Sequence, residues 1–239
     1  MESGEPVTVR DCQVPVLTVI PHKLQPEQWD LTTTQILPYI DGFNHIAKIS
    51  SLADVGSGLV RACVQNLLYH KVRNGLNSLN LIVPVVFQVV GITTIFQYSN
   101  VYTVTPLMSA LRRDKQLQQD LLTSIARREG DLPSFRDVYT FISSFTYGTT
   151  VKDLCQRMSP SRLGFDETRL VQYCVLRGIL RRVHKYPVWT EEEGGGEARL
   201  TSWMTGDHDT DEICVATGVP SAYLDTKLEE WTGVVVIWK

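Results

Sequence analysis

Residues 59–68, Leu-Val-Arg-Ala-Cys-Val-Gln-Asn-Leu-Leu, and residues 89–96, Val-Val-Gly-Ile-Thr-Thr-Ile-Phe, decide the fold class. In the first stretch the apolar residues recur at helical spacing on one broad face, which predicts an amphipathic helix. The second stretch is rich in β-branched residues and predicts a strand. Two shorter helical patterns precede them, in residues 29–40 and 46–55. Two helices, a longer helix and a strand, in this order, are typical of a winged-helix unit, a helix-turn-helix variant.

The same order recurs twice further along the sequence. Helical patterns at 135–142, 149–158 and 170–175 lead into an apolar run at 179–189, and a shortened copy occupies residues 211–238. The sequence therefore predicts a mainly α fold with small β wings, built from tandem winged-helix-like modules. The predicted segments are an extended N-terminal arm or linker (1–28), a first winged-helix-like module (29–105), a connecting helix (106–130), a second winged-helix-like module (131–190), a flexible acidic loop (191–206) and a C-terminal helix-turn-helix-strand unit (207–239).

The composition is that of a globular protein and argues against a nucleic-acid-binding, a disulfide-bonded and a membrane-spanning protein. The net charge of the 239 residues is −3 and the sequence pI is about 6.0, whereas a free-standing nucleic-acid-binding protein usually carries a basic excess. The five cysteines form no CxxC pair, which favours reduced thiols in a cytosolic protein. The most apolar stretch, residues 81–96, is interrupted by Pro84 and by polar residues, and falls short of the ~20 apolar residues of a membrane-spanning helix. We expect no membrane span.

Eight blocks of the sequence are similar to blocks of one known family. They are QWDLTT (28–33), QILPYIDG (35–42), VQNLLY (64–69), QYSNVY (97–102), GTTVKDL (148–154), KYPV (185–188), DEIC (211–214) and IWK (237–239). From about residue 14 to residue 239 the blocks resemble, in the same order, the C-terminal, helix-rich half of nitrogen permease regulator 2-like proteins. No block is a catalytic signature, so the collinear order carries the resemblance.

The resemblance implies a non-catalytic role in a larger assembly. Members of this family begin with a longin-type domain and pair with a nitrogen permease regulator 3-like subunit and a DEP-domain subunit in the GATOR complex. That complex stimulates GTP hydrolysis by Rag GTPases and restrains TOR complex 1 during amino-acid starvation. The stimulating arginine lies in the longin domain, which we expect this sequence to lack, so we expect neither enzyme activity nor a cofactor. The implied location is cytoplasmic, peripheral at the lysosomal or vacuolar membrane through the complex.

Residues 72–88 depart from the family's pattern. The family runs directly from the helix that ends in Leu-Leu-Tyr to the next strand, and removing these seventeen residues joins Lys71 to Val89 and restores that spacing. The end pairs Val72-Arg73 and Phe87-Gln88 can be encoded by GTG-AGA and TTT-CAG, which resemble a splice donor and an acceptor. We hypothesise that the insertion is a translated retained intron; the alternative is a lineage-specific surface loop. We expect it to be disordered or poorly packed.

One basic cluster is a candidate binding site. Arg177, Arg181, Arg182 and Lys185, with His184 among them, gather around the end of the second module's last helix and the strand that follows. In a DNA-binding winged helix such a cluster contacts phosphates, because phosphate neutralisation dominates affinity there. On an interaction subunit the same side chains would face an acidic neighbour. A nucleic-acid-binding module is therefore the alternative to the interaction subunit.

Residues 206–212, Gly-Asp-His-Asp-Thr-Asp-Glu, have the composition of a metal site without its spacing. They lack the ordered oxygen ligands of a calcium loop and the paired histidines or cysteines of a zinc site. A helix N-cap at Asp209, Thr210 or Asp211 explains the composition without a metal. The sequence also contains no GxSxG, P-loop or GxGxxG motif, so we predict no catalytic or metal-binding residues.

Overall fold

The computed structural model describes residues 8–18, 29–69, 71–73, 86–128, 131–190 and 197–239, with 71–73 and 86–88 described as backbone only. Helices predominate, and the strands form small antiparallel pairs, which confirms the predicted mainly α class with small β elements. The chain divides into two compact units, Met1–Ile95 and Phe96–Lys239. Within the described residues, no helix is both long and apolar enough to cross a membrane.

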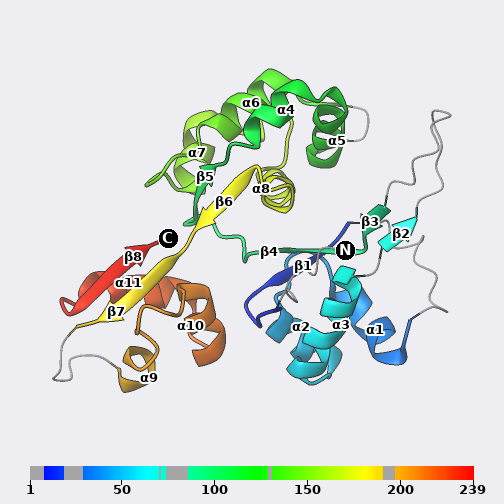
Figure 1. Cartoon of the computed structure of the whole chain (residues 1–239). Helices are drawn as coiled ribbons and strands as arrows, with labels where there is room; N and C mark the ends of the chain where they lie inside the picture. The colour runs from blue at the N-terminus through cyan, green and yellow to red at the C-terminus, as the bar shows by residue number, and fades with distance from the viewer. Residues whose placement is uncertain (1–7, 19–28, 70, 74–85, 129–130, 191–196) are drawn as a thin grey trace. The chain divides into compact units, whose positions relative to one another are not determined.

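The first unit is built around three helices (Figure 1). Its described elements are β1 (Val14–Leu17), α1 (Leu31–Ile36), the 3-10 helix η3 (Leu37–Tyr39), α2 (Ile46–Ala53), α3 (Ser57–Tyr69), β2 (Lys71–Arg73), β3 (Val86–Gln88) and β4 (Val90–Thr93). Apolar residues at helical spacing on α3, such as Val60, Val64 and Leu67, are fully buried against Ile36 and Ile49 from the two shorter helices. The amphipathic pattern of residues 59–68 thus forms the core as predicted.

The predicted N-terminal arm contains part of this fold. Residues 14–17 form strand β1, which pairs antiparallel with β4 from Val14 opposite Thr93 to Leu17 opposite Val90. Proline is typical of irregular chain, yet a strand with one partner tolerates Pro15 at a position whose backbone nitrogen faces away from that partner. The N–H of Thr18 donates to the carbonyl of Val89 at 3.1 Å, so Val16 faces β4 with its N–H and Pro15 does not.

The two ends of the insertion at 72–88 pair with each other. Strands β2 and β3 are antiparallel, with Lys71 opposite Gln88 and Arg73 opposite Val86. The described ends are therefore ordered as a strand pair, and the predicted poorly packed loop does not apply to them. Residues 74–85 lie outside the described residues.

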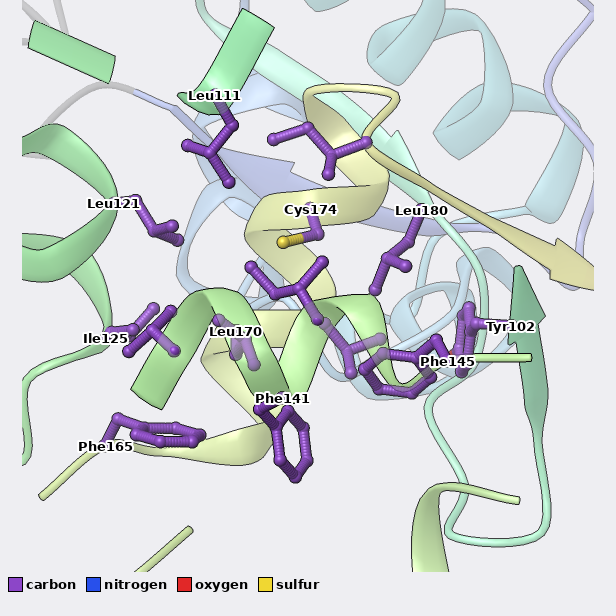
Figure 2. Packing of buried hydrophobic residues seen from close by; sticks show 14 of the residues in the cluster. Tyr102, Leu111, Leu121, Ile125, Phe141, Phe145, Phe165, Leu170, Cys174 and Leu180 are labelled. Carbon is purple, nitrogen blue, oxygen red and sulfur yellow. The ribbon is translucent and has the colours of Figure 1, made fainter. Parts of the chain in front are cut away.

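The second unit contains a larger and a smaller core. Its elements are β5 (Val101–Val104), α4 (Met108–Arg113), α5 (Lys115–Ile125), α6 (Phe135–Ser143), α7 (Val151–Met158), α8 (Glu167–Leu176), β6 (Leu180–Val183), β7 (Lys185–Trp189), α9 (Ala198–Thr201), α10 (Thr210–Thr217), α11 (Ser221–Glu230) and β8 (Val234–Trp238). Strand β5 pairs antiparallel with β6, and β7 pairs antiparallel with β8. In the larger core, Phe141 meets Phe145 and Phe165 edge-on at centroid distances of 5.5 and 5.4 Å (Figure 2).

Two predicted elements are interrupted. The connecting helix expected at 106–130 is two helices, α4 and α5, because Asp114 leaves the helical conformation and its carboxylate accepts from the N–H groups of Gln116 and Leu117. Such a cap starts a new helix rather than continuing the old one. The apolar run at 179–189 is likewise two strands, β6 and β7, separated at His184. Strand β5 and helix α9 were not predicted.

The helix expected at 149–158 is confirmed as α7, and the helix cap expected among residues 209–211 is confirmed at Asp209. Thr150 and Asp153 form a reciprocal capping box at the start of α7, and the carboxylate of Asp209 caps α10 by accepting from the N–H of Glu212 at 3.0 Å. Helix α10 belongs to the smaller core, in which Leu200, Met204, Ile213 and Leu224 are buried. Helix α10 and its cap place Asp209 and Asp211 beside strand β6 and His184.

Candidate functional site: the Arg182–Asp211 charge cluster

The four basic residues predicted to form one patch have different environments. Arg177 is exposed at the C-terminal end of α8, with its guanidinium 5.4 Å from the centre of the Tyr173 ring. Arg181 is exposed on β6. Arg182, the next residue, is buried, and Lys185 is half-buried on β7. Of the four predicted residues, only Arg177 and Arg181 are exposed enough to share a phosphate-binding patch, and phosphate binding by these two stays a prediction.

Arg182 is committed to a buried ion pair. Its two terminal nitrogens donate to the two carboxylate oxygens of Asp211, one of them at 2.9 Å, and only 6% of the arginine and 7% of the aspartate side chain is exposed. Burial by itself lowers the pKa of Arg182. The negative charge of Asp211 and the hydrogen bonds to it outweigh this effect and raise the pKa above its ordinary value, so the guanidinium stays charged. A bidentate pair of this kind fixes geometry as well as charge. Arg182 is thus a structural residue that ties β6 to α10.

A histidine and two aspartates meet beside this pair. One potential ligand atom each from His184, Asp209 and Asp211 lies within 4.8 Å of the others, and Nδ1 of His184 is 3.6 Å from Oδ2 of Asp209. One oxygen of Asp209 already accepts from the backbone of α10, and both oxygens of Asp211 accept from Arg182. A cation would have to compete with the guanidinium for Asp211, so these residues fit an ion-pair network better than a metal site.

A further charged pair lies at the edge of the cluster. The ammonium group of Lys185 donates to Oδ1 of Asp225 at 2.6 Å and lies 5.3 Å from the centre of the Trp238 ring. Trp238 also meets Tyr147 edge-on, with ring centroids 6.2 Å apart. These contacts join α11, β7 and β8 to the segment before α7, and so extend the connection made by Arg182 and Asp211.

The pocket at this cluster is too small for a substrate. Its volume is about 20 Å³, near the space of a single water molecule, and its lining includes Asn100, Arg182, Asp211, Cys214 and Asp225. Burial, together with the three neighbouring aspartates, raises the pKa of the Cys214 thiol to about 12. A thiol with that pKa is protonated at neutral pH and is a poor nucleophile. The arrangement holds two parts of the second unit together rather than positioning groups for a reaction.

Comparison with known proteins identifies the family of this chain. The family model described as "Nitrogen permease regulator 2" matches residues 2–126 and 122–232. The chain belongs to the nitrogen permease regulator 2 family. It is 35% identical over 240 residues to the GATOR complex protein NPRL2 of Drosophila melanogaster, with all of this chain and 53% of that protein covered. It is 27% identical over 221 residues to the nitrogen permease regulator 2 homolog of Schizosaccharomyces pombe, covering 88% of this chain and 49% of that protein.

These matches confirm the family resemblance seen in the sequence blocks. A third relative, nitrogen permease regulator 2 of Saccharomyces cerevisiae, is 35% identical over 107 residues, which cover 45% of this chain and 15% of that protein. The chain spans about half the length of the first two curated relatives that it matches. What a whole member of the nitrogen permease regulator 2 family does is therefore a matter of proposal for this chain.

Sequence reasoning missed the acidic half of the cluster in this family member. The sequence predicts Asp211 as one of three candidate helix caps, and no motif marks Asp225. The partner of Arg182 lies 29 residues further along the chain, in another helix, so no local pattern marks the pair. The one available signal was a pair of arginines between the apolar residues Leu180 and Val183 of a short strand, which indicates that one of them is buried and needs a partner but not which one.

Proposed function

We propose that this chain is a non-catalytic interaction and scaffold part of a GATOR-type complex that acts on Rag GTPases. The complex would restrain TOR complex 1 during amino-acid starvation, and its other subunits would be the nitrogen permease regulator 3-like and DEP-domain proteins. The proposed location is cytoplasmic, peripheral at the lysosomal or vacuolar membrane through the complex. The observation that carries the proposal is similarity along the whole chain to a relative named as a GATOR complex protein.

The exposed side of α3 supports a protein partner over nucleic acid. Leu59, Ala62 and Asn66 are exposed and spaced at 3 and 4 residues, so they share one uncharged helix face. The neighbouring Arg61 has its Nε 3.4 Å from an oxygen of Asp11. A helix that enters a DNA groove needs cations for the phosphates, and this face offers none. An uncharged face with an exposed leucine suits a protein surface instead.

The element order supports a winged-helix-like first unit. Three helices are followed by strand β4, which pairs with β1 from the start of the unit. In this proposal the fold is a scaffold for protein contacts, because a fold of this type does not by itself specify nucleic-acid binding. The ion pairs of the second unit play the corresponding scaffold role there.

Co-purification tests the proposed role. The chain is expressed with a tagged nitrogen permease regulator 3-like subunit and captured at about 0.1 M and about 0.5 M salt. We expect retention at both concentrations, because apolar interfaces are insensitive to screening. We expect Leu59→Lys with Ala62→Lys to reduce retention about tenfold, while Leu132→Lys, at an exposed leucine of the second unit, changes nothing.

Two results would contradict the proposed partner class, and a third would contradict the non-catalytic part of the proposal. One is loss of the tagged partner at both salt concentrations for the unchanged chain. The other is retention on duplex DNA that falls steeply with salt, which is the behaviour of the nucleic-acid-binding alternative. Acceleration of GTP hydrolysis by the chain alone, with a purified Rag GTPase, would contradict the non-catalytic part of the proposal.

A further inference from the structure

Strand β8 is an edge strand with an apolar sequence. Its five residues, Val-Val-Val-Ile-Trp, pair with β7 alone among the strands that the structure describes (Figure 1). The other side of β7 is occupied, because Trp189 donates to the carbonyl of Met204 and Gly206 donates to the carbonyl of Pro187. Among the described residues of this small sheet, the edge open to a further strand is therefore that of β8. Natural edge strands are usually protected by lysine, proline, a bulge or a covering segment.

The backbone of β8 presents three residues outward. His184 and Lys239 exchange both N–H to carbonyl bonds, at 2.8 and 3.0 Å. Because antiparallel pairs alternate, Ile237 and Val235 also direct their N–H and carbonyl groups toward β7. Val234, Val236 and Trp238 direct theirs away from it. Within the described part of the chain, no hydrogen bond joins these outward groups to another residue.

The sheet also has an apolar outer face. Trp189 and Val234, which lie opposite each other, pack against the smaller core. Side chains alternate along a strand, so the residues next to them on β7 and β8 point to the opposite face of the sheet. These are Tyr186, Val188, Val235 and Ile237, which we call the outer face. Val235 is 54% exposed and Ile237 is 40% exposed. A strand added at β8 would continue this face and cover part of it.

Charge indicates what kind of strand fits. Residues 184–239 contain eleven aspartates and glutamates but only four lysines and arginines. The net charge of this part is therefore negative, and two copies of it would repel each other in solution. A segment that carries lysine or arginine at its ends would instead be attracted. The charges thus favour a basic partner over a second copy of this chain.

We propose that β8 is a docking edge for an extended segment of a partner protein, with alternating apolar residues and basic ends, which adds a strand beside Val236. Main-chain bonds to the outward groups would supply affinity, and the outer face would supply side-chain specificity. This inference rests on the proposed role as an interaction subunit and names one surface for it. It concerns the second unit, whereas the co-purification test above changes α3 in the first unit.

The test uses the full chain and a defined probe. The probe is a fluorescent, end-capped peptide, Lys-Lys-Thr-Val-Thr-Val-Thr-Val-Lys-Lys, and its matched control has glutamate in place of lysine. Fluorescence anisotropy should show saturable binding of the basic peptide and affinity about tenfold lower for the acidic one. Val236→Pro removes the outward N–H and should weaken binding about tenfold, while Val236→Thr keeps that N–H and should bind like the unchanged chain.

A second measurement on the unchanged chain does not depend on the proline variant folding. Hydrogen exchange by NMR should show that saturating basic peptide slows exchange of the Val236 N–H. The Ile237 N–H, already bonded to β7, should be protected with and without peptide. Unchanged exchange at Val236 would overturn the proposal, as would equal affinity of folded Val236→Pro and Val236→Thr. Self-association that Val236→Pro abolishes would identify a second copy as the occupant and overturn it too. None of these outcomes bears on capture by the nitrogen permease regulator 3-like subunit.

Discussion

Arg182 and Asp211 are 29 residues apart in the sequence and face each other through two hydrogen bonds inside the second unit. The pair joins strand β6, which belongs to the larger core, to helix α10, which belongs to the smaller one. More than nine-tenths of each side chain is shielded from water, so the charge of each residue is stabilised by the other residue and not by solvent. Removing one partner leaves a buried charge that nothing compensates.

Replacing Arg182 by Leu should therefore lower the free energy of unfolding by about 3–5 kcal/mol. The double change Arg182→Leu with Asp211→Leu should recover most of that loss, since apolar pairs of similar volume often replace buried ion pairs at little cost. Urea unfolding followed by tryptophan fluorescence is suitable, because four of the five tryptophans lie in residues 184–239. The control is Arg181→Leu at the exposed neighbouring position of β6, which should change stability by less than about 0.5 kcal/mol. An equal loss in the single and double variants would show that the charges are not what couples the two sites.

The capping box of α7 makes a pH-dependent contribution. Hydrogen bonds from the side chain and backbone of Thr150 lower the pKa of Asp153 below its ordinary value. The stabilisation is fully present above the ordinary pKa of about 3.9 and is lost as the pH falls through the lower pKa of the folded chain. Thr150→Ala should raise the pKa of Asp153, as measured by NMR titration of its carboxyl carbon. Thr150→Ser keeps the hydroxyl and should leave the pKa low; a high pKa in both variants would argue against the hydroxyl as the cause.

Much of the helical structure could be predicted because its causes are local. The caps at Thr150 and Asp209 and the apolar spacing of α3 involve residues within a few positions of one another. Strand β5 was missed for the opposite reason. Its four residues are β-branched or aromatic, but the run is short, and its partner strand β6 lies about eighty residues away, with Val101 opposite Val183. Local patterns carry no information on such a distant partner.

The charged residues of the candidate site were predictable in type but not in environment. Arg181 and Arg182 are identical in the sequence pattern, yet the first is exposed and the second is buried. Their difference arises from the alternation of the strand and from the position of α10 above one of its faces. Asp211 had a satisfactory local explanation as a helix cap, which concealed its long-range role. The family itself was predictable, because collinear blocks survive where no single motif does.

The insertion at 72–88 should be removable without loss of the first unit. Strands β2 and β3 pair with each other, so Lys71 lies opposite Gln88, and Val89 follows directly. The backbones at Lys71 and Val89 are therefore already close together, and a direct peptide bond between these two residues requires little rearrangement. We expect the shortened chain to unfold cooperatively, with a melting temperature within about 4–8 °C of the unchanged chain.

The matched control for that deletion is removal of Val90–Thr93. These residues pair with β1, so their loss should abolish cooperative unfolding of the first unit. Loss of cooperativity in the chain without 72–88 would show instead that the insertion is part of the fold. Sequencing of the mature transcript separately tests the retained-intron hypothesis, since the codons for 72–88 should be absent from the spliced message.

Comparison of two glycines distinguishes the cost of backbone strain from the cost of a steric clash between side chains. Gly206 and Gly148 have φ values of +86° and +81°, so an added Cβ strains both backbones similarly, by about 1–2 kcal/mol. At Gly206 that Cβ would also lie 2.9 Å from Cγ2 of Val188, whereas at Gly148 no atom lies within 4 Å. Valine is stiff at χ1 and cannot easily move away. Gly206→Ala should therefore cost about 1–3 kcal/mol more than Gly148→Ala in urea unfolding.

A second substitution identifies the source of that excess. Val188→Ala removes the methyl group that an alanine at position 206 would meet, so it should cost less in the Gly206→Ala background than in the unchanged chain. The coupling free energy between the two positions measures the crowding directly. If Gly206→Ala and Gly148→Ala cost the same, and Val188→Ala is additive with both, the loop at 204–206 relaxes away from β7. In that case the segment 204–206 can move away from β7, and β7 as well as β8 could accept a further strand.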